Sequence, residues 1–132
     1  MRYMPPARRA LLVGAVLLLA GCVNPQSGGG ADYVLFFTAQ SAALDHPATL
    51  ILDTAAAEAK AEPGSRIIVA GYADRIGTPQ ANQILSRLRA QVVADALVER
   101  GVSRGRITLR PRGATGGDPG VESRRVEILI GS

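Results

Sequence analysis

Beyond residue 32 of this 132-residue chain, four short apolar runs alternate with two segments of helical periodicity. Apolar, β-branched runs between turn residues are typical of strands, and apolar residues three to four positions apart are typical of helices. The expected strands are residues 33–37, 66–71, 106–111 and 125–130. The expected helices are residues 47–61, capped by Asp45 or His46, and residues 80–100, followed by Gly101. This order predicts an α+β, β-α-β-α-β-β sandwich with both helices packed on one face of a mixed sheet.

The amino-terminal residues have the composition of an export signal. Three arginines (Arg2, Arg8 and Arg9) precede an uncharged apolar run at residues 10–21, which ends in small residues before Cys22. The run is well short of the ~20 residues that span a bilayer. The segment Leu-Ala-Gly-Cys at residues 19–22 resembles the lipobox of bacterial lipoproteins. That resemblance implies cleavage before Cys22 and a diacylglyceryl group on its thiol. The alternatives are an ordinary signal peptide and an uncleaved anchor.

Charge and composition narrow the classes of function. The formal charge is +4, from 15 basic and 11 acidic residues, but cleavage at Cys22 leaves 12 basic residues and a net charge of +1. Aromatic residues make up 4% of the chain and tryptophan is absent, so nucleic-acid binding is not expected. One cysteine and one histidine cannot form an internal disulfide or a structural zinc site. We expect a periplasmic protein with no cofactor, a signal peptide at residues 1–21, a glycine-rich tether at 22–31 and one domain at 32–132.

The buried faces of the two helices can be predicted from spacing. For the first helix the expected face is Leu50, Ile51, Thr54, Ala57 and Ala61. For the second it is Ile84, Leu85, Leu88, Val92, Val93, Ala96 and Leu97. Arg87 then points to solvent, whereas Arg89 lies inside the edge of the apolar stripe, with Asn82 and Ser86 on the same edge. An arginine there must extend to solvent, form a structural ion pair, or bind an anionic ligand such as a carboxylate.

Asp74 supplies a charge opposite to that of Arg89. It follows the second predicted strand, in a loop that leads to the second helix. Together the two groups could hold a zwitterion, with the ammonium on Asp74 and the carboxylate on Arg89. Aspartate is common in turns, so this pattern alone is weak.

Several motifs of the chain, in order and spacing, resemble the OmpA-like C-terminal domain, the family that includes peptidoglycan-associated lipoproteins. These are Gly-x-x-Asp-x-x-Gly at residues 71–77, Asn-x-x-Leu-Ser-x-x-Arg-Ala at 82–90 and Arg-Arg-Val-Glu at 124–127. The resemblance covers roughly residues 33–130. It implies non-covalent binding of the diaminopimelate in the peptidoglycan stem peptide, with Asp74 and Arg89 holding its backbone ammonium and carboxylate. By the same resemblance Asn82 orders the loop or contacts the ligand, and Arg124 is a weaker candidate for a second contact.

Four positions depart from the usual pattern of the family. Tyr72 and Ala73 stand where the family usually has histidine and threonine, Phe37 where many members have aspartate, and Ser123 where asparagine is frequent.

We expect an outer-membrane lipoprotein, since Val23 is not the aspartate that marks inner-membrane retention in enteric bacteria. Partners of the Tol type are plausible by resemblance. The alternative is an envelope-assembly lipoprotein with weakened or lost binding. An enzyme is not expected, because His46 stands alone and no Gly-x-Ser-x-Gly motif is present.

Overall fold

The computed structural model describes residues 32–117 and 119–131, so the predicted signal peptide, Cys22 and most of the tether lie outside the described residues. Its main elements are β1 (Tyr33–Phe36), α1 (His46–Ala61), β2 (Ile67–Ala73), α2 (Pro79–Glu99), β3 (Ile107–Ala114) and β4 (Arg125–Ile130). Short 3₁₀ turns occupy Arg104–Arg106 and Val121–Ser123. The predicted order of strands and helices is confirmed. In the described part of the chain, no helix is both long and apolar enough to cross a bilayer.

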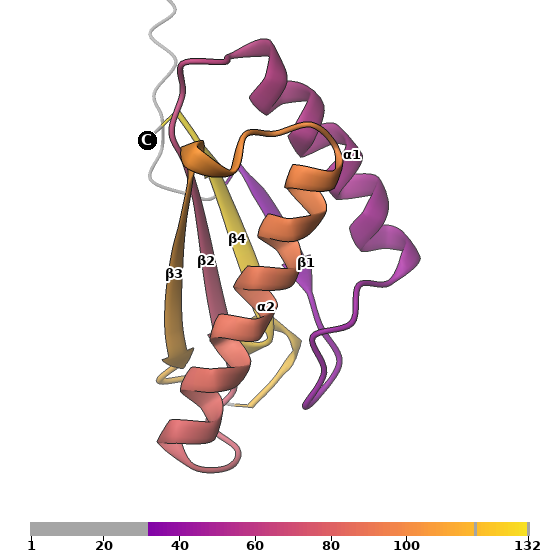
Figure 1. The fold of residues 1–132 in the computed structure, drawn as a ribbon. Coiled ribbons are helices and arrows are strands. Elements are labelled where there is room, and N and C mark those ends of the chain that lie inside the picture. The colour runs from indigo at the N-terminus through magenta and orange to yellow at the C-terminus, as the bar shows by residue number, and fades with distance from the viewer. Residues whose placement is uncertain (1–31, 118, 132) are drawn as a thin grey trace, which may run out of the picture.

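The four strands form one mixed sheet in the order β1-β4-β2-β3. β2 and β3 are parallel, and β4 runs antiparallel to its neighbours β1 and β2. Figure 1 shows both helices on one side of this sheet, as the sequence predicts. β3 continues to Ala114, beyond its predicted end at residue 111, and Pro111 is tolerated within it because β3 is an edge strand.

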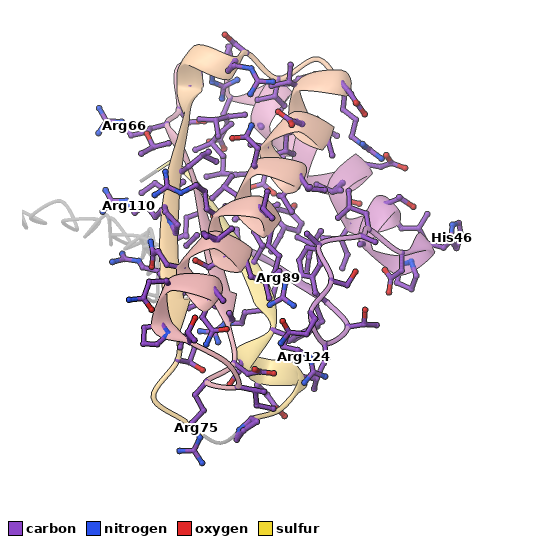
Figure 2. The ribbon with its side chains drawn as sticks, turned by 60° about the horizontal axis from the view of Figure 1, so that its bottom comes forward. His46, Arg66, Arg75, Arg89, Arg110 and Arg124 are labelled. Carbon is purple, nitrogen blue, oxygen red and sulfur yellow. The ribbon has the colours of Figure 1, made fainter. Side chains whose placement is uncertain are left out.

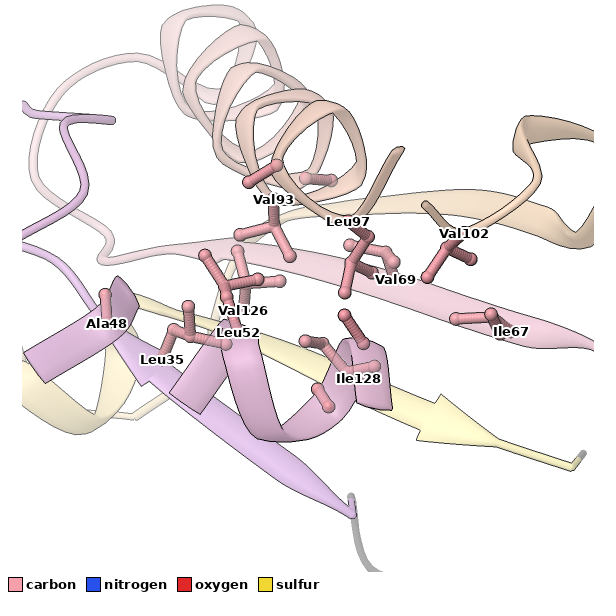
Figure 3. Close-up of a cluster of buried hydrophobic side chains, with 14 of the residues drawn as sticks. Leu35, Ala48, Leu52, Ile67, Val69, Val93, Leu97, Val102, Val126 and Ile128 are labelled. Atoms are coloured by element: carbon pink, nitrogen blue, oxygen red, sulfur yellow. The ribbon is translucent and has the colours of Figure 1, made fainter. Parts of the chain in front are cut away.

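The core lies between the helices and the inner face of the sheet (Figure 3). Alternate residues of the strands face inward, and at the centre Val69 is in register with Ile128 of β4 and Leu109 of β3. The largest fully buried apolar side chains are Leu35, Leu52, Ile67, Val69, Val93, Leu97, Val126 and Ile128. Because these come from both helices and three strands, the core fixes the two helices against the sheet.

Helix α1 begins as predicted but buries a different face. The Asp45 carboxylate caps it by accepting a hydrogen bond of 2.9 Å from the backbone N–H of Ala48. Its buried residues are Ala48, Leu52, Ala55, Ala56 and Ala59, whereas Leu50 is 55% exposed. The predicted face was wrong because six of the sixteen residues of the helix are alanines, which make several of its faces similarly apolar.

Helix α2 is also rotated relative to the prediction. Ile84 and Leu88 are more than half exposed, while Asn82, Ser86 and Arg89 are buried. The reason is that α2 approaches β2 closely at Gly71, which has no side chain. A Cβ on Gly71 would lie 2.0 Å from the backbone oxygen of Ser86. The Ser86 hydroxyl then accepts a hydrogen bond of 2.9 Å from the backbone N–H of Gly113 in β3. Polar Ser86 therefore faces the sheet, and Arg89 lies on the buried side rather than at its edge.

Candidate ligand-binding site

The loop after β2 buries a carboxylate. Asp74 directly follows the strand and is 3% exposed. Its Oδ1 accepts a hydrogen bond of 3.1 Å from the backbone N–H of Ile76, which fixes the start of the loop. Gly77, at φ +98°, turns the chain toward α2, where the Thr78 hydroxyl accepts from Ala81 N–H at 3.1 Å and caps the helix.

Arg89, on α2, is fully buried and donates to three backbone carbonyls. Its Nε lies 2.8 Å from the oxygen of Ser41, and its two terminal nitrogens lie 2.9 Å from that of Tyr72 and 3.0 Å from that of Thr38. Its guanidinium carbon is 5.3 Å from the centre of the Phe37 ring. The side chain therefore joins the end of β2 to the segment after β1. A guanidinium has five N–H groups, so two remain after these three bonds.

Arg124 is the direct ionic partner of Asp74. One of its terminal nitrogens lies 3.6 Å from Oδ2 of Asp74, and its Nε donates to the Phe37 carbonyl at 3.0 Å. Its side chain is 22% exposed, so this end of the cluster reaches solvent. Figure 2 shows Arg124 near Arg89, with Arg75 farther out. The sequence predicts Arg124 as a weaker candidate for a ligand contact than Arg89, and this ranking stays a prediction. In the structure, Arg124 is the arginine with a salt bridge to Asp74.

The charges of Asp74, Arg89 and Arg124 act on one another. Burial lowers the pKa of Arg89 from its ordinary value, the Asp74 carboxylate opposes that shift, and the positive charge of Arg124 adds to it. The Arg89 guanidinium nevertheless stays protonated and positively charged, because an arginine is always charged in a protein. The three groups thus form a cluster with two positive charges and one negative charge, which we call the charge cluster.

Asn82 is 2% exposed and lies in the first turns of α2. Its Oδ1 is 3.8 Å from the position that a Cβ on Gly77 would occupy. This places the amide against the loop that carries Asp74, which is the place expected for a residue that orders that loop. His46 begins α1 and lies apart from Arg89 and Arg124 in Figure 2. Across residues 32–117 and 119–131, no three His, Cys, Asp or Glu side chains are grouped so as to hold a metal ion.

The surroundings of Arg89 were not predicted from the sequence. The carbonyls of Thr38, Ser41 and Tyr72 receive Arg89, and backbone acceptors carry no residue-type signal. The contact of Phe37 with the guanidinium has a partial signal, since the chain carries an aromatic residue where aspartate is frequent. With these carbonyls around it, Arg89 is fully buried, whereas the Arg124 side chain reaches solvent.

The comparisons with known proteins agree with this fold. Outer membrane protein A of Shimwellia blattae is 49% identical over 47 residues, which are 36% of this chain and 20% of that protein. The peptidoglycan-binding protein ArfA of Mycobacterium tuberculosis is 37% identical over 87 residues, 61% of this chain and 27% of ArfA. The chain thus spans about a quarter or less of the length of these curated relatives.

Solved structures show the same architecture. The peptidoglycan-associated lipoprotein of Burkholderia pseudomallei superimposes with a TM-score of 0.69 at 23% identity, covering 74% of this chain and 88% of that one. The OmpA-like domain of FopA1 from Francisella tularensis gives a TM-score of 0.66 at 25% identity, covering 74% and 70%. The family model described as the OmpA family matches residues 36–124. This chain therefore belongs to the OmpA family.

Proposed function

We propose that this protein binds peptidoglycan non-covalently through the diaminopimelate of the stem peptide. The observation that carries the proposal is the charge cluster at the carboxyl end of β2, where Asp74 lies 3.6 Å from Arg124 and within the field of Arg89. The α-carbon of diaminopimelate bears an ammonium and a carboxylate, which such a cluster complements. Asp74 receives the ammonium, a guanidinium receives the carboxylate in a charge-assisted bond, and Asn82 holds the loop. This function makes and breaks no bond and needs no cofactor.

The direction of the strands supports a tethering role. The described chain begins beside the end of β4, where the Asp32 N–H donates to the Ile128 carbonyl at 3.0 Å. Asp74 lies at the far end of β2, which runs antiparallel to β4, so the seven residues of β2 separate the two places by roughly 20 Å. A lipid on Cys22 and a wall ligand at Asp74 would then pull on opposite ends of the domain. We propose accordingly a lipid-anchored, outer-membrane location, with Tol-type proteins as further partners.

An envelope-assembly lipoprotein with lost ligand binding is the second candidate. It is favoured by the complete burial of Arg89 and by the three carbonyls that occupy its donors. Under the binding proposal, the segment of Thr38 and Ser41 moves aside or the ligand carboxylate contacts Arg124 instead. The two proposals differ in whether the mature domain is retained by the wall.

Co-sedimentation with purified diaminopimelate-type peptidoglycan tests the binding. Asp74→Asn should abolish it, because the amide still accepts from Ile76 N–H but no longer attracts an ammonium. Asp53→Asn is the matched control, since Asp53 pairs with Arg100 on the surface and its replacement changes the net charge equally. If the wild type does not sediment, the assembly function is favoured. If Asp74→Asn sediments as the wild type does, the site is misassigned.

Cell fractionation tests the anchor separately. Cys22→Ser removes the thiol that a lipid would modify and should release the protein from membranes. Persistent membrane association of that variant would contradict lipidation, whatever the outcome with peptidoglycan.

A further inference from the structure

The outer face of the sheet is the side away from α1 and α2 (Figure 1). Because side chains alternate along a strand, the neighbours of the core residues point to this face. In β2, Val69 is buried in the core while Ile68 and Tyr72 face outward, and the register aligns Ile68 with Leu129 of β4 and Thr108 of β3. Among the described residues, no helix covers this face.

Basic residues gather on the side of this face formed by β2 and β3. Arg66, Arg110 and Arg112 are exposed, and Figure 2 shows Arg66 and Arg110 projecting to the same side, away from α2. Arg112 is close enough to Tyr72 for its charge to oppose the raised pKa of that phenol, which burial and Glu127 cause. These arginines therefore extend the positive charge along the whole length of β3.

The acidic groups on this face are already engaged. Glu127 accepts from the Arg125 Nε at 2.8 Å and from the Tyr72 hydroxyl at 3.2 Å, and the Arg125 guanidinium stacks 4.1 Å from the Tyr72 ring centre. Asp32, at the margin, accepts from the Ile130 N–H at 2.5 Å. Within the described part of the chain, the outer face thus has a surplus of positive charge.

Apolar side chains lie on the β1 side of the face and near the end of β4. Phe36 is 47% exposed and is in register with Arg125, and Val34 and Leu129 are partly exposed nearby. A surface of guanidinium groups beside an aromatic ring and aliphatic side chains is amphipathic. Anionic bilayers attract arginines to their headgroups and accept apolar side chains at the boundary with the acyl chains.

We infer that the outer face of the sheet, carrying Arg66, Arg110, Arg112 and Phe36, docks on an anionic phospholipid bilayer. The charge selects an anionic surface, and the exposed apolar half favours a bilayer over an acidic protein segment that would satisfy the arginines alone. The inference rests on the proposed lipid anchor in one respect, because the anchor keeps the domain close to the membrane. Ten residues from Cys22 to the domain reach at most about 35 Å, so an anchored domain stays beside its membrane.

A single tryptophan can report the docking, because the chain has none of its own. Phe36→Trp places the reporter on the outer face, and Leu50→Trp places a control on α1, where the replaced side chain is 55% exposed. The full chain, purified from membranes, is reconstituted into vesicles of phosphatidylcholine or of equal parts phosphatidylcholine and phosphatidylglycerol. We expect a blue shift and quenching by brominated lipid for Phe36→Trp only, only with phosphatidylglycerol, and lost in high salt because surface attraction is screened.

A second part of the experiment removes positive charges from the outer face. In the Phe36→Trp background, Arg110→Gln with Arg112→Gln should abolish the shift, whereas Lys60→Gln with Arg87→Gln, two exposed residues of the helices, should leave it intact. Equal spectra in the two vesicles, or equal effects of the two pairs, overturn the inference and leave the face to an acidic protein. Flotation with phosphatidylcholine vesicles measures the lipid anchor independently, because an anchored chain floats with neutral vesicles even if the outer face does not dock. Failure of the anchor is thereby distinguished from failure of the docking face.

Discussion

Replacing Gly71 by alanine tests whether the close approach of α2 to β2 shapes the charge cluster. The new Cβ would lie 2.0 Å from the Ser86 backbone oxygen and 3.2 Å from the Ala90 Cβ. Non-bonded heavy atoms prefer about 3.5 Å, so the helix must move by about 1.5 Å. Gly71 is not in the left-handed region, so the cost is steric rather than conformational.

The displacement has a calculable effect on Arg89. Its bonds to the three carbonyls measure 2.8–3.0 Å, and a shift of the helix carries them beyond the ~3.2 Å limit of a good N–H···O bond. Overpacking costs about 1–3 kcal/mol, and a weakened bond to a charged donor adds about 1.5 kcal/mol or more. We therefore expect Gly71→Ala to lower the free energy of unfolding by about 3–5 kcal/mol.

Urea unfolding followed by circular dichroism measures this loss. Gly64→Ala is the matched control, because a Cβ there has nothing within 4 Å, and its effect should stay within about 0.5 kcal/mol. A Gly71→Ala protein within about 1 kcal/mol of the wild type would refute both the tight packing and its effect on Arg89.

Three further perturbations probe the same packing. Arg89→Met should cost about 3 kcal/mol or more in urea unfolding, because three carbonyls lose their donor at about 1 kcal/mol or more each; equal stability would mean that water replaces the guanidinium. The hydrogen bond to Glu58 raises the pKa of Tyr33 to about 12, above the ~10 of an unfolded chain, so its contribution is complete below pH ~10 and is lost as pH rises toward about 12. Alkaline unfolding of Tyr33→Phe should therefore lack that part of the pH dependence, and an unchanged profile would contradict it. Asp45→Ala removes the cap of α1 and should cost about 1 kcal/mol in thermal unfolding, unless the helix starts elsewhere.

The position of the charge cluster bears on the proposed tethering role. Its members come from the loop after β2, from α2 and from the residue just before β4, which are far apart in sequence. The sheet holds the three at one end and Asp32, the first described residue, at the other. A load between the ends would therefore run along the strands of the sheet.

The sequence by itself determined the order of strands and helices and the family motifs, because these depend on local spacing and on turn chemistry. It narrowed the cap of α1 to Asp45 or His46, and the structure shows that it is Asp45. Its motifs also led to Asp74, Arg89, Asn82 and Arg124 as candidate ligand contacts, and that assignment stays a prediction.

Only the tertiary structure decided which faces the helices bury. Alanines make the faces of α1 nearly equivalent, and in α2 the approach at Gly71 turns Ser86 and Arg89 toward the sheet while Ile84 is left exposed. The pairing of Asp74 with Arg124 likewise depends on bringing β2 and β4 together. A periodic pattern records how apolar each side of a helix is, but it does not record how closely a neighbouring backbone can approach.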